Sequence, residues 1–279
     1  MKDLIKTSKD LRQERWWLLS SSSGTAGALM KTIRGGVYYK LSSYNAHDGF
    51  YGNESVNELI VSRLLDRLNI PHVRYRLEWV LVRVGGSDYE TWACKSSNYR
   101  LPGESRVRFE SYYELWKHPG ESPLAFCVRQ GWSREISQMM IADFIVQNRD
   151  RHGSNTEVLI APDGTARLAP IFDFGMSLFC YHNRRSTLRI ADAPVMEDVA
   201  VNNYIGTNSL FRNLGLLPEK PALPLLSERD YAAIFAGLDT AVDAQQQLKI
   251  REMIEKRCAY YAEIQGRSQE PPLIPHSPS

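Results

Sequence analysis

Hydrophobic residues recur at helical spacing in one segment of the first third of the chain. In residues 54–68 they lie three or four positions apart, which predicts a helix with one apolar face. Asn69-Ile70-Pro71 ends this helix, because the residue before a proline avoids the helical conformation. The apolar positions are Val56, Leu59, Ile60, Leu64, Leu65 and Leu68.

Shorter apolar runs on both sides of this helix predict strands. Arg34-Gly35-Gly36 separates two of the runs and predicts a hairpin. Gly-Gly-Ser-Asp at residues 85–88 predicts a second hairpin in the same way. The expected order is three strands, the helix and two strands. The candidate strands are residues 16–20, 28–33, 37–41, 72–84 and 89–95.

From about residue 100 the pattern becomes mainly helical. In residues 133–147 the apolar side chains lie on one helical face, and Ser133 is the expected N-cap. Ser227 and Asp230 resemble a capping box at the start of a later helix. A hairpin is expected at 156–172, and an irregular segment then runs to about 203. The other expected helices are residues 111–118, 227–238 and 243–264, and the proline-rich end at 266–279 is expected to be disordered.

Composition and charge bear on the binding partners and on the expected cellular compartment. The 279 residues carry a net charge of +2, from 34 basic and 32 acidic side chains, so nucleic-acid binding is not indicated. No run of 18 apolar residues predicts a membrane span, and the N-terminus lacks the apolar stretch of a signal peptide. The spacing of the cysteines does not favour zinc, and reduced thiols in a cytoplasmic protein are expected. The cysteines are Cys94, Cys127, Cys180 and Cys258.

Two polar motifs carry the candidate chemistry. Gln-Asn-Arg-Asp-Arg-His-Gly-Ser-Asn spans residues 147–155, and Pro-Ile-Phe-Asp-Phe-Gly spans 170–175. The Pro162-Asp163-Gly164 turn lies midway between Asn155 and Asp173, so a hairpin would bring these two side chains together. Their amide and carboxylate oxygens suit magnesium, and Asp150 can face the same point. The alternative is a solvated loop of polar residues.

The motifs resemble a kinase catalytic loop followed by Asp-Phe-Gly. The run from Asn148 to Asn155 is similar to the N-x-D-R-H-x-x-N of HipA-like kinases, the bacterial toxin-type serine/threonine kinases. The core of the motif is shared with phosphatidylinositol 3- and 4-kinases. The resemblance covers residues 16 to about 265. It implies that Asp150 is the catalytic base and that Asn155 and Asp173 hold magnesium for ATP.

The same resemblance requires a lysine on the third strand and a carboxylate partner on the helix. Lys40 stands at that position, although an exposed strand lysine is the alternative. Glu58 is its expected partner, and Glu54 lies one turn earlier on the same face. The other interpretation of Glu58 is a capping box with Ser55. His152 is expected to brace the loop through its ring nitrogens.

The expected nucleotide contacts come from a serine-rich loop and from the hinge. Small residues at 20–27 replace the usual Gly-x-Gly-x-x-Gly and let backbone amides approach phosphates. Within this loop Ser22, Ser23, Gly24 and Thr25 are the candidate phosphate contacts. The hinge is placed near Cys94–Asn98, with Cys94 as a nucleotide contact. Self-phosphorylation at Ser20–Ser23, or at Ser186 or Thr187, is one interpretation of these hydroxyls, and the alternative is that the serines only form a small, polar loop.

These inferences predict an α+β, two-lobed protein-kinase-like fold. The expected small antiparallel-sheet lobe is 1–95, the mainly helical catalytic lobe is 96–265, and the tail is 266–279. The expected function is ATP- and magnesium-dependent transfer of the γ-phosphate to serine or threonine of a protein, including the chain itself. The resemblance also implies an antitoxin-type partner. The alternatives are a lipid or small-molecule kinase on the same fold and a non-catalytic nucleotide-binding protein.

Overall fold

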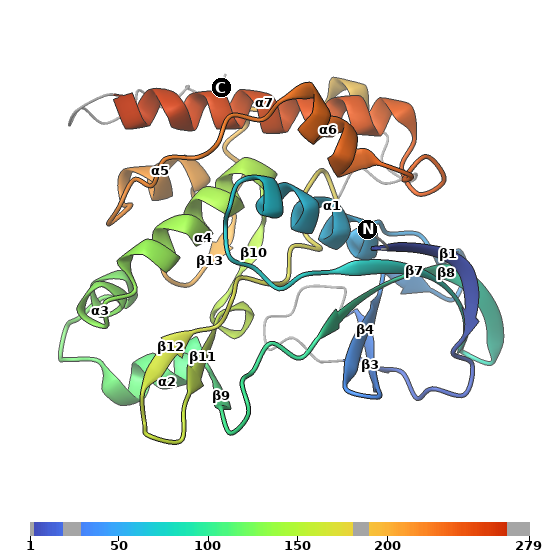
Figure 1. Ribbon diagram of the computed structural model, residues 1–279, viewed down its shortest axis with the longest axis horizontal. Coiled ribbons are helices and arrows are strands. Elements are labelled where there is room, and N and C mark those ends of the chain that lie inside the picture. The colour runs from blue at the N-terminus through green and yellow to red at the C-terminus, as the bar shows by residue number, and fades with distance from the viewer. Residues whose placement is uncertain (1–2, 19–28, 181–189, 267–279) are drawn as a thin grey trace.

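A six-stranded sheet forms one end of the molecule (Figure 1). The computed structural model describes residues 3–18, 29–180 and 190–266. The strand order is β1-β7-β8-β4-β3-β2, in which β1 runs parallel to β7 and the other neighbours are antiparallel. The strands are β1 (Leu4–Asp10), β2 (Trp17–Leu18), β3 (Met30–Arg34), β4 (Val37–Leu41), β7 (Arg76–Val84) and β8 (Ser87–Ser97).

Paired glycines close the two hairpins that the sequence predicts in the first third of the chain. Gly35 and Gly36 connect β3 to β4 with φ of 56° and 75°. Gly85 and Gly86 connect β7 to β8 with φ of 60° and 86°. Two successive residues with positive φ match the right-handed twist of a tight hairpin, and glycine takes that conformation without steric cost. Both predicted hairpins are therefore confirmed.

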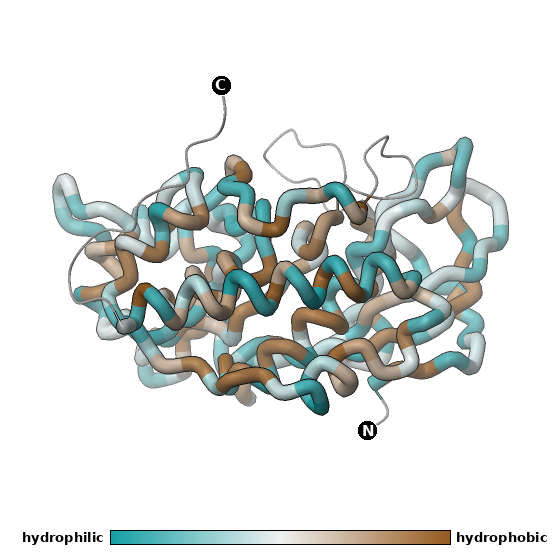
Figure 2. Tube along the Cα trace, turned by 90° about the horizontal axis from the view of Figure 1, so that it is seen from above, coloured by the Kyte–Doolittle hydropathy of each residue, from teal (hydrophilic) through white to brown (hydrophobic). Residues whose placement is uncertain are grey.

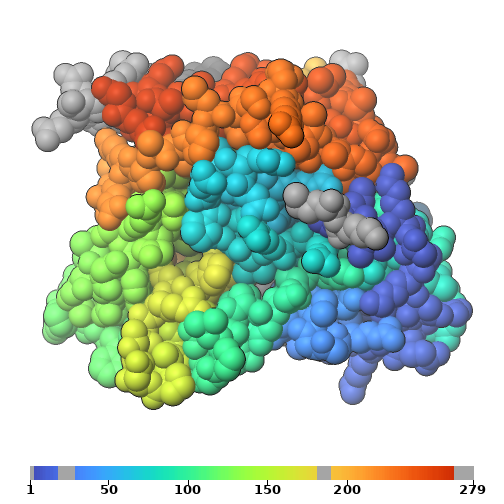
Figure 3. Space-filling model, viewed as in Figure 1, coloured from blue at the N-terminus to red at the C-terminus, as the bar shows by residue number. Residues whose placement is uncertain are grey.

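Helix α1 (Glu54–Arg67) lies against the sheet and is the predicted helix. Its apolar face is fully buried, with Leu59, Ile60 and Leu64 at 0% exposure. The helix ends where Asn69 takes a φ of 54°, directly before Ile70-Pro71. Figure 3 shows α1 between the C-terminal helices and the sheet. Helix α1 therefore packs against the sheet on one side and against α6 on the other.

Seven α-helices lie in the part of the chain that the structure describes. Helices α2 to α5 gather at the end opposite the sheet, and α6 and α7 run along one side (Figure 1). Three small sheets complete the fold: β5 with β6, β9 with β11 and β12, and β10 with β13. The further helices are α2 (Phe109–Trp116), α3 (Pro123–Arg129), α4 (Ser133–Val146), α5 (Leu210–Gly215), α6 (Glu228–Phe235) and α7 (Ala244–Gly266). The further strands are β5 (Tyr44–Asn45), β6 (Gly49–Phe50), β9 (Ser105–Arg108), β10 (Asp150–Arg151), β11 (Glu157–Ile160), β12 (Ala166–Leu168) and β13 (Asn202–Asn203).

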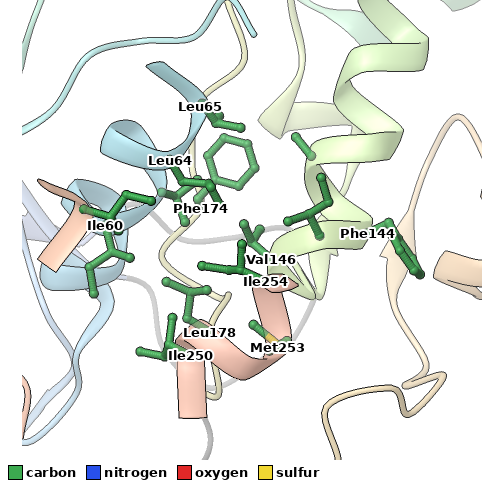
Figure 4. Packing of buried hydrophobic residues seen from close by; sticks show 14 of the residues in the cluster. Ile60, Leu64, Leu65, Phe144, Val146, Phe174, Leu178, Ile250, Met253 and Ile254 are labelled. Carbon is green, nitrogen blue, oxygen red and sulfur yellow. The ribbon is translucent and has the colours of Figure 1, made fainter. Parts of the chain in front are cut away.

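One apolar cluster unites helices from distant parts of the sequence. Side chains of α1, α4 and α7 meet around the segment that follows Asp173 (Figure 4). Phe174 is 2% exposed within this cluster, so that segment is anchored in the main core. Helix α7 carries both hydrophilic and hydrophobic residues along its length (Figure 2). Labelled members of the cluster are Ile60, Leu64, Leu65, Phe144, Val146, Phe174, Leu178, Ile250, Met253 and Ile254.

Several local predictions need correction. Strand β1 precedes the first expected strand, and α3 and α5 were not expected. Ser133 is the first residue of α4 and does not cap it, because Trp132 holds the N-cap position. The capping box of Ser227 and Asp230 is present as predicted. No described helix has both the length and the apolarity that a membrane crossing requires.

Candidate functional site

Lys40 contacts two carboxylates that come from different elements. It lies on β4, opposite Lys31 of β3 and Cys94 of β8. Its Nζ donates a hydrogen bond of 2.7 Å to Glu58 Oε1 on α1 and a second, short one to Asp173 Oδ1. Lys40 is 9% exposed, so it is not the solvated strand lysine of the alternative interpretation. The predicted Lys40–Glu58 ion pair is confirmed.

Helix α1 presents Glu58 to the site through its first turns. Asn53 is the N-cap of α1, and the backbone N–H of Ser55 donates to Ser42 Oγ, so Ser55 forms no capping box with Glu58. The Ser55 hydroxyl donates to the backbone oxygen of Lys40 at 3.0 Å. Glu54 accepts bonds from the backbone and hydroxyl of Ser43 and is not the partner of Lys40. Glu58 Oε2 accepts the backbone N–H of Phe174 at 2.9 Å. Glu58 therefore fixes both the lysine and the backbone directly after Asp173.

The hairpin of β11 and β12 joins the two motifs as its turn predicts. The strands are antiparallel, and Gly164 turns with a φ of 86°. The guanidinium of Arg151 donates to the backbone oxygens of Asn155 and Phe172, at 3.0 Å and 2.6 Å. One side chain thus contacts both ends of the hairpin. The hairpin thus joins the backbone of the two motifs, and the meeting of the Asn155 and Asp173 side chains stays a prediction.

A buried ion pair holds Arg151 in place. Its guanidinium lies 2.8 Å from Asp143 on α4, and the two side chains are 2% and 1% exposed. Breaking such a pair leaves an uncompensated buried charge. The pair is therefore buried, and it fixes the guanidinium that holds the 147–155 loop.

Asp150 lies at the start of the same loop. Its Oδ1 accepts a hydrogen bond of 3.3 Å from Asn202, and its Oδ2 lies 3.7 Å from His152 Nε2. His152 Nδ1 accepts the backbone N–H of Ser154, so the histidine braces the loop as predicted. The Asn155 amide donates to the backbone oxygen of Asp150 at 2.9 Å.

The charges at the site perturb one another. Burial alone would lower the pKa of Lys40, but Asp173 and Glu58 raise it well above its usual range. Burial alone would raise the pKa of Asp173, but Lys40 and Lys31 hold it below its usual range. Burial raises the pKa of Glu58 against the attraction of Lys40. Burial also raises the pKa of Asp150, an effect that His152 opposes and Asp173 increases.

The backbone around Asp173 is constrained. Asp173 takes a φ of 63°, which is uncommon for a residue with a side chain. Asn57 of α1 donates its amide to the backbone oxygens of Gly175 and Ser177, at 3.0 Å and 2.8 Å. A Cβ at Gly175 would lie 3.1 Å from the Glu54 Cβ. The segment after Asp173 is therefore held against α1 by packing and by hydrogen bonds.

The donor set around Asp173 can accept a hard cation. Asn155 uses its Nδ2 on Asp150, which leaves its amide oxygen as the group that can bind a metal. Asp173 has one oxygen on Lys40, while its Oδ2 is 4.0 Å from Lys31. One amide oxygen and one carboxylate oxygen suit magnesium, which keeps several waters and nucleotide phosphates as further ligands. Among the described residues no group of three or more His, Cys, Asp and Glu side chains is arranged for a metal.

Four contributing residues were missed by sequence analysis: Lys31, Asp143, Arg151 and Asn202. The register of the β3–β4 hairpin could have identified Lys31, because pairing Arg34 with Val37 places it opposite Lys40. Arg151 lies inside the recognised motif, but its contact with Asp143 depends on tertiary packing. Asn202 carries no local signal, because only the fold brings it beside Asp150.

The expected nucleotide contacts divide into two groups. Ser22, Ser23, Gly24 and Thr25 lie outside the described residues, as do Ser186 and Thr187. Cys94 lies inside β8, is 1% exposed and has a pKa that burial raises. Strand β8 continues to Ser97, so the chain leaves the sheet only at the far end of the expected hinge. A nucleotide contact at Cys94 stays a prediction.

Comparison with known proteins finds similarity only to solved structures. No protein-family model and no curated protein matches the chain. One similar structure is the Helicobacter pylori proinflammatory kinase CtkA, at 12% identity and a TM-score of 0.48, covering 92% of this chain and 99% of that one. Another is the toxin–antitoxin system HipA and HipB of Shewanella oneidensis with its operator DNA. It has 14% identity and a TM-score of 0.43, covering 90% of this chain and 68% of that one.

Proposed function

We propose that the chain is an ATP- and magnesium-dependent kinase that transfers the γ-phosphate to serine or threonine of a protein, including itself. The observation that carries the proposal is the position of Lys40, which contacts Glu58 and Asp173 at once. A lysine held by a helix carboxylate, beside a second carboxylate that can bind metal, is the arrangement that protein kinases use for phosphoryl transfer.

In this proposal each residue has a separate task. Lys40 binds the α- and β-phosphates of ATP while Glu58 keeps its ammonium group in place. Asp173 and Asn155 would hold magnesium, which would supply positive charge to neutralise the phosphates. Asp150 orients the acceptor hydroxyl and accepts its proton. Lys40 contacts only Oδ1 of Asp173, so Oδ2 would be the oxygen that faces magnesium.

We further propose the two-lobed division, with the sheet and α1 forming the small lobe at 1–95 and the remaining helices the large lobe at 96–265. The site residues agree with this division, since Lys40 and Glu58 precede residue 95 whereas Asp150, Asn155 and Asp173 follow it. Nucleotide would then bind where the two groups face each other. An antitoxin-type partner is part of the same proposal and rests on the sequence motif alone.

The test is transfer of labelled phosphate from ATP, with and without magnesium. Wild type should label protein substrates, whereas Asp150→Asn and Asp173→Asn should lose about 10²-fold or more of the activity. Asp163→Asn is the matched control, because Asp163 lies at the exposed tip of the β11–β12 turn. Equal labelling by wild type and Asp173→Asn would refute the metal assignment. Labelling of lipid instead of protein would refute the acceptor class.

A further inference from the structure

A residue 52 positions after Asp150 contacts its carboxylate. Strand β13 pairs in parallel with β10, so that Asn202 lies beside Asp150. The backbone N–H of Asn202 donates to Arg149 O at 2.9 Å, and that of Tyr204 donates to Arg151 O at 3.1 Å. The Asn202 side chain then donates its Nδ2–H to Asp150 Oδ1 at 3.3 Å. Backbone pairing and a side-chain bond thus act together on the loop.

The segment that carries Asn202 is itself fixed. Asn203 Oδ1 accepts the backbone N–H groups of Ile205 and Gly206, at 3.1 Å and 2.8 Å. Val201 donates its backbone N–H to Asn208 at 3.0 Å, and Val201 and Ile205 are buried. Asn202 is exposed although its backbone is held. Supporting hydrogen bonds from a fixed segment are what hold a functional side chain in its productive geometry.

We propose that Asn202 is a positioning residue that holds the Asp150 carboxylate in the orientation required to accept the acceptor's proton. The inference rests on the proposed function. Asn202 binds one carboxylate oxygen, so the carboxylate cannot rotate freely, and the second oxygen lies on the side of His152. An amide suits this task because it donates a hydrogen bond without adding charge.

The step that depends on this orientation is the attack of the acceptor hydroxyl. The acceptor oxygen forms a bond to the γ-phosphorus as the bond from that phosphorus to the β–γ bridging oxygen breaks. The hydroxyl proton passes to Asp150, and ADP leaves with the bridging oxygen. Misplacement of a reacting group by about 1 Å can cost about 10²-fold in rate. Loss of the Asn202 bond should therefore act on turnover more than on nucleotide binding.

The experiment measures kcat and the KM for ATP in Asn202→Ala, Asn202→Gln and Asn208→Ala. Asn208 is the matched control, since it is an exposed asparagine on the same segment and its side chain makes no hydrogen bond among the described residues. We expect Asn202→Ala to lower kcat by about 10- to 100-fold with an unchanged KM for ATP. Asn202→Gln, which keeps the amide donor, should recover part of the loss, and Asn208→Ala should match wild type.

Each contrary outcome has a definite meaning. An inactive wild type would overturn the proposed function and this inference with it. An active wild type with equal kcat in Asn202→Ala and Asn208→Ala would overturn the inference alone. The same holds if Asn202→Ala raises the KM for ATP at constant kcat. Equal losses in the alanine and glutamine variants, accompanied by a lower melting temperature, would assign Asn202 a purely structural role and overturn the inference too.

Discussion

Lys40 neutralises two carboxylates that come from different parts of the chain. Its ammonium group compensates the buried carboxylate of Glu58, which is 0% exposed, and also contacts Asp173. A charge taken out of water is tolerated only when it is paired. Removal of the lysine alone should therefore be worse for the fold than removal of the lysine together with Glu58.

A double-mutant cycle tests this at the residue scale. Lys40→Met should lower the free energy of unfolding by about 3 kcal/mol, because it leaves Glu58 buried without its cation. Adding Glu58→Gln should recover about 1 kcal/mol or more, since the orphaned charge is removed. Urea denaturation of the four proteins measures the coupling. A double variant less stable than Lys40→Met would contradict the argument.

The sequence could predict the site residues that lie near their own motifs. Asp150, Asn155 and Asp173 follow from spacing and from the turn at 162–164, and Lys40 follows from its strand. It could not decide whether Glu58 pairs with Lys40 or with Ser55, because both are compatible with a helix start. The decision comes from the start of α1, because Asn53 is its N-cap and the backbone N–H of Ser55 donates to Ser42 and not to Glu58.

At the scale of elements, the β11–β12 hairpin determines how the two motifs meet. Gly164 turns with a φ of 86°, and no atom lies within 4 Å of a Cβ added there. Gly164→Ala therefore tests backbone conformation without a steric clash, and we expect a loss of about 1–2 kcal/mol in the free energy of unfolding. Chemical denaturation measures it.

Gly215→Ala is the matched control for the hairpin. Gly215 is the last residue of α5, has no positive φ and also has open space around an added Cβ. Alanine there should be neutral or stabilising. If both alanine variants lose the same stability, the turn conformation of Gly164 is not the cause.

Acid stability of the α2–α3 connection should depend on Glu121. The Arg129 guanidinium and the His118 backbone N–H bind its carboxylate, and Arg129 lowers its pKa to about 2 from an ordinary value of 4.5. A carboxyl with a lowered folded-state pKa stabilises the fold above the unfolded pKa and loses that effect as the pH falls toward 2. Glu121→Gln should thus be less stable than wild type at pH 7, and the difference should shrink between pH 4.5 and 2.

The pH series needs a control and has a clear contrary result. Glu135→Gln removes a negative charge from α4, where no basic side chain among the described residues contacts it. It separates the effect of net charge from the effect of the Arg129 contact. A difference between wild type and Glu121→Gln that stays constant from pH 7 to pH 3 would contradict the assignment.

Prediction of the elements succeeded where a pattern is local and long. Helix α1 and the glycine-closed hairpins have clear periodicity and turn residues. Strand β1 was missed because its residues, Leu-Ile-Lys-Thr-Ser-Lys-Asp, are mostly polar, and its place is set by parallel pairing with β7. Helix α3 has seven residues and α5 has six, which is too short for a periodic signal.

At the scale of the whole molecule, the site depends on the apolar cluster of α1, α4 and α7, whose residues come from distant parts of the chain. Phe174 lies in that cluster, and Glu58 accepts its backbone N–H, so Asp173 is held between core and sheet. No segment near either motif encodes this arrangement, since α7 begins at Ala244, well after the second motif ends at Gly175. The sequence therefore predicts the motifs and the helix but not the packing that assembles them.

Binding of nucleotide should stabilise the whole chain. A ligand that binds only the folded state at 100 times its Kd adds about 2.7 kcal/mol, which raises the melting temperature of a chain of this size by several degrees. We expect ATP with magnesium to give this shift and Lys40→Ala to weaken it without removing it, because magnesium contacts through Asp173 and Asn155 would remain. ATP with a chelator should give a smaller shift, because the contact of Lys40 with the phosphates would remain but the magnesium contacts would be lost.

Lys31 and Lys256 make this experiment specific. Lys31 lies 4.0 Å from Asp173, whereas Lys40 is held by Glu58 as well. Lys31→Ala should therefore reduce the nucleotide-induced shift in melting temperature less than Lys40→Ala does. Lys256 lies on α7, where it pairs with Glu252, and Lys256→Ala should leave the shift unchanged. If Lys31→Ala weakens nucleotide binding and Lys40→Ala does not, then Lys31 is the phosphate ligand, and the Lys40–Glu58 pair is a structural ion pair.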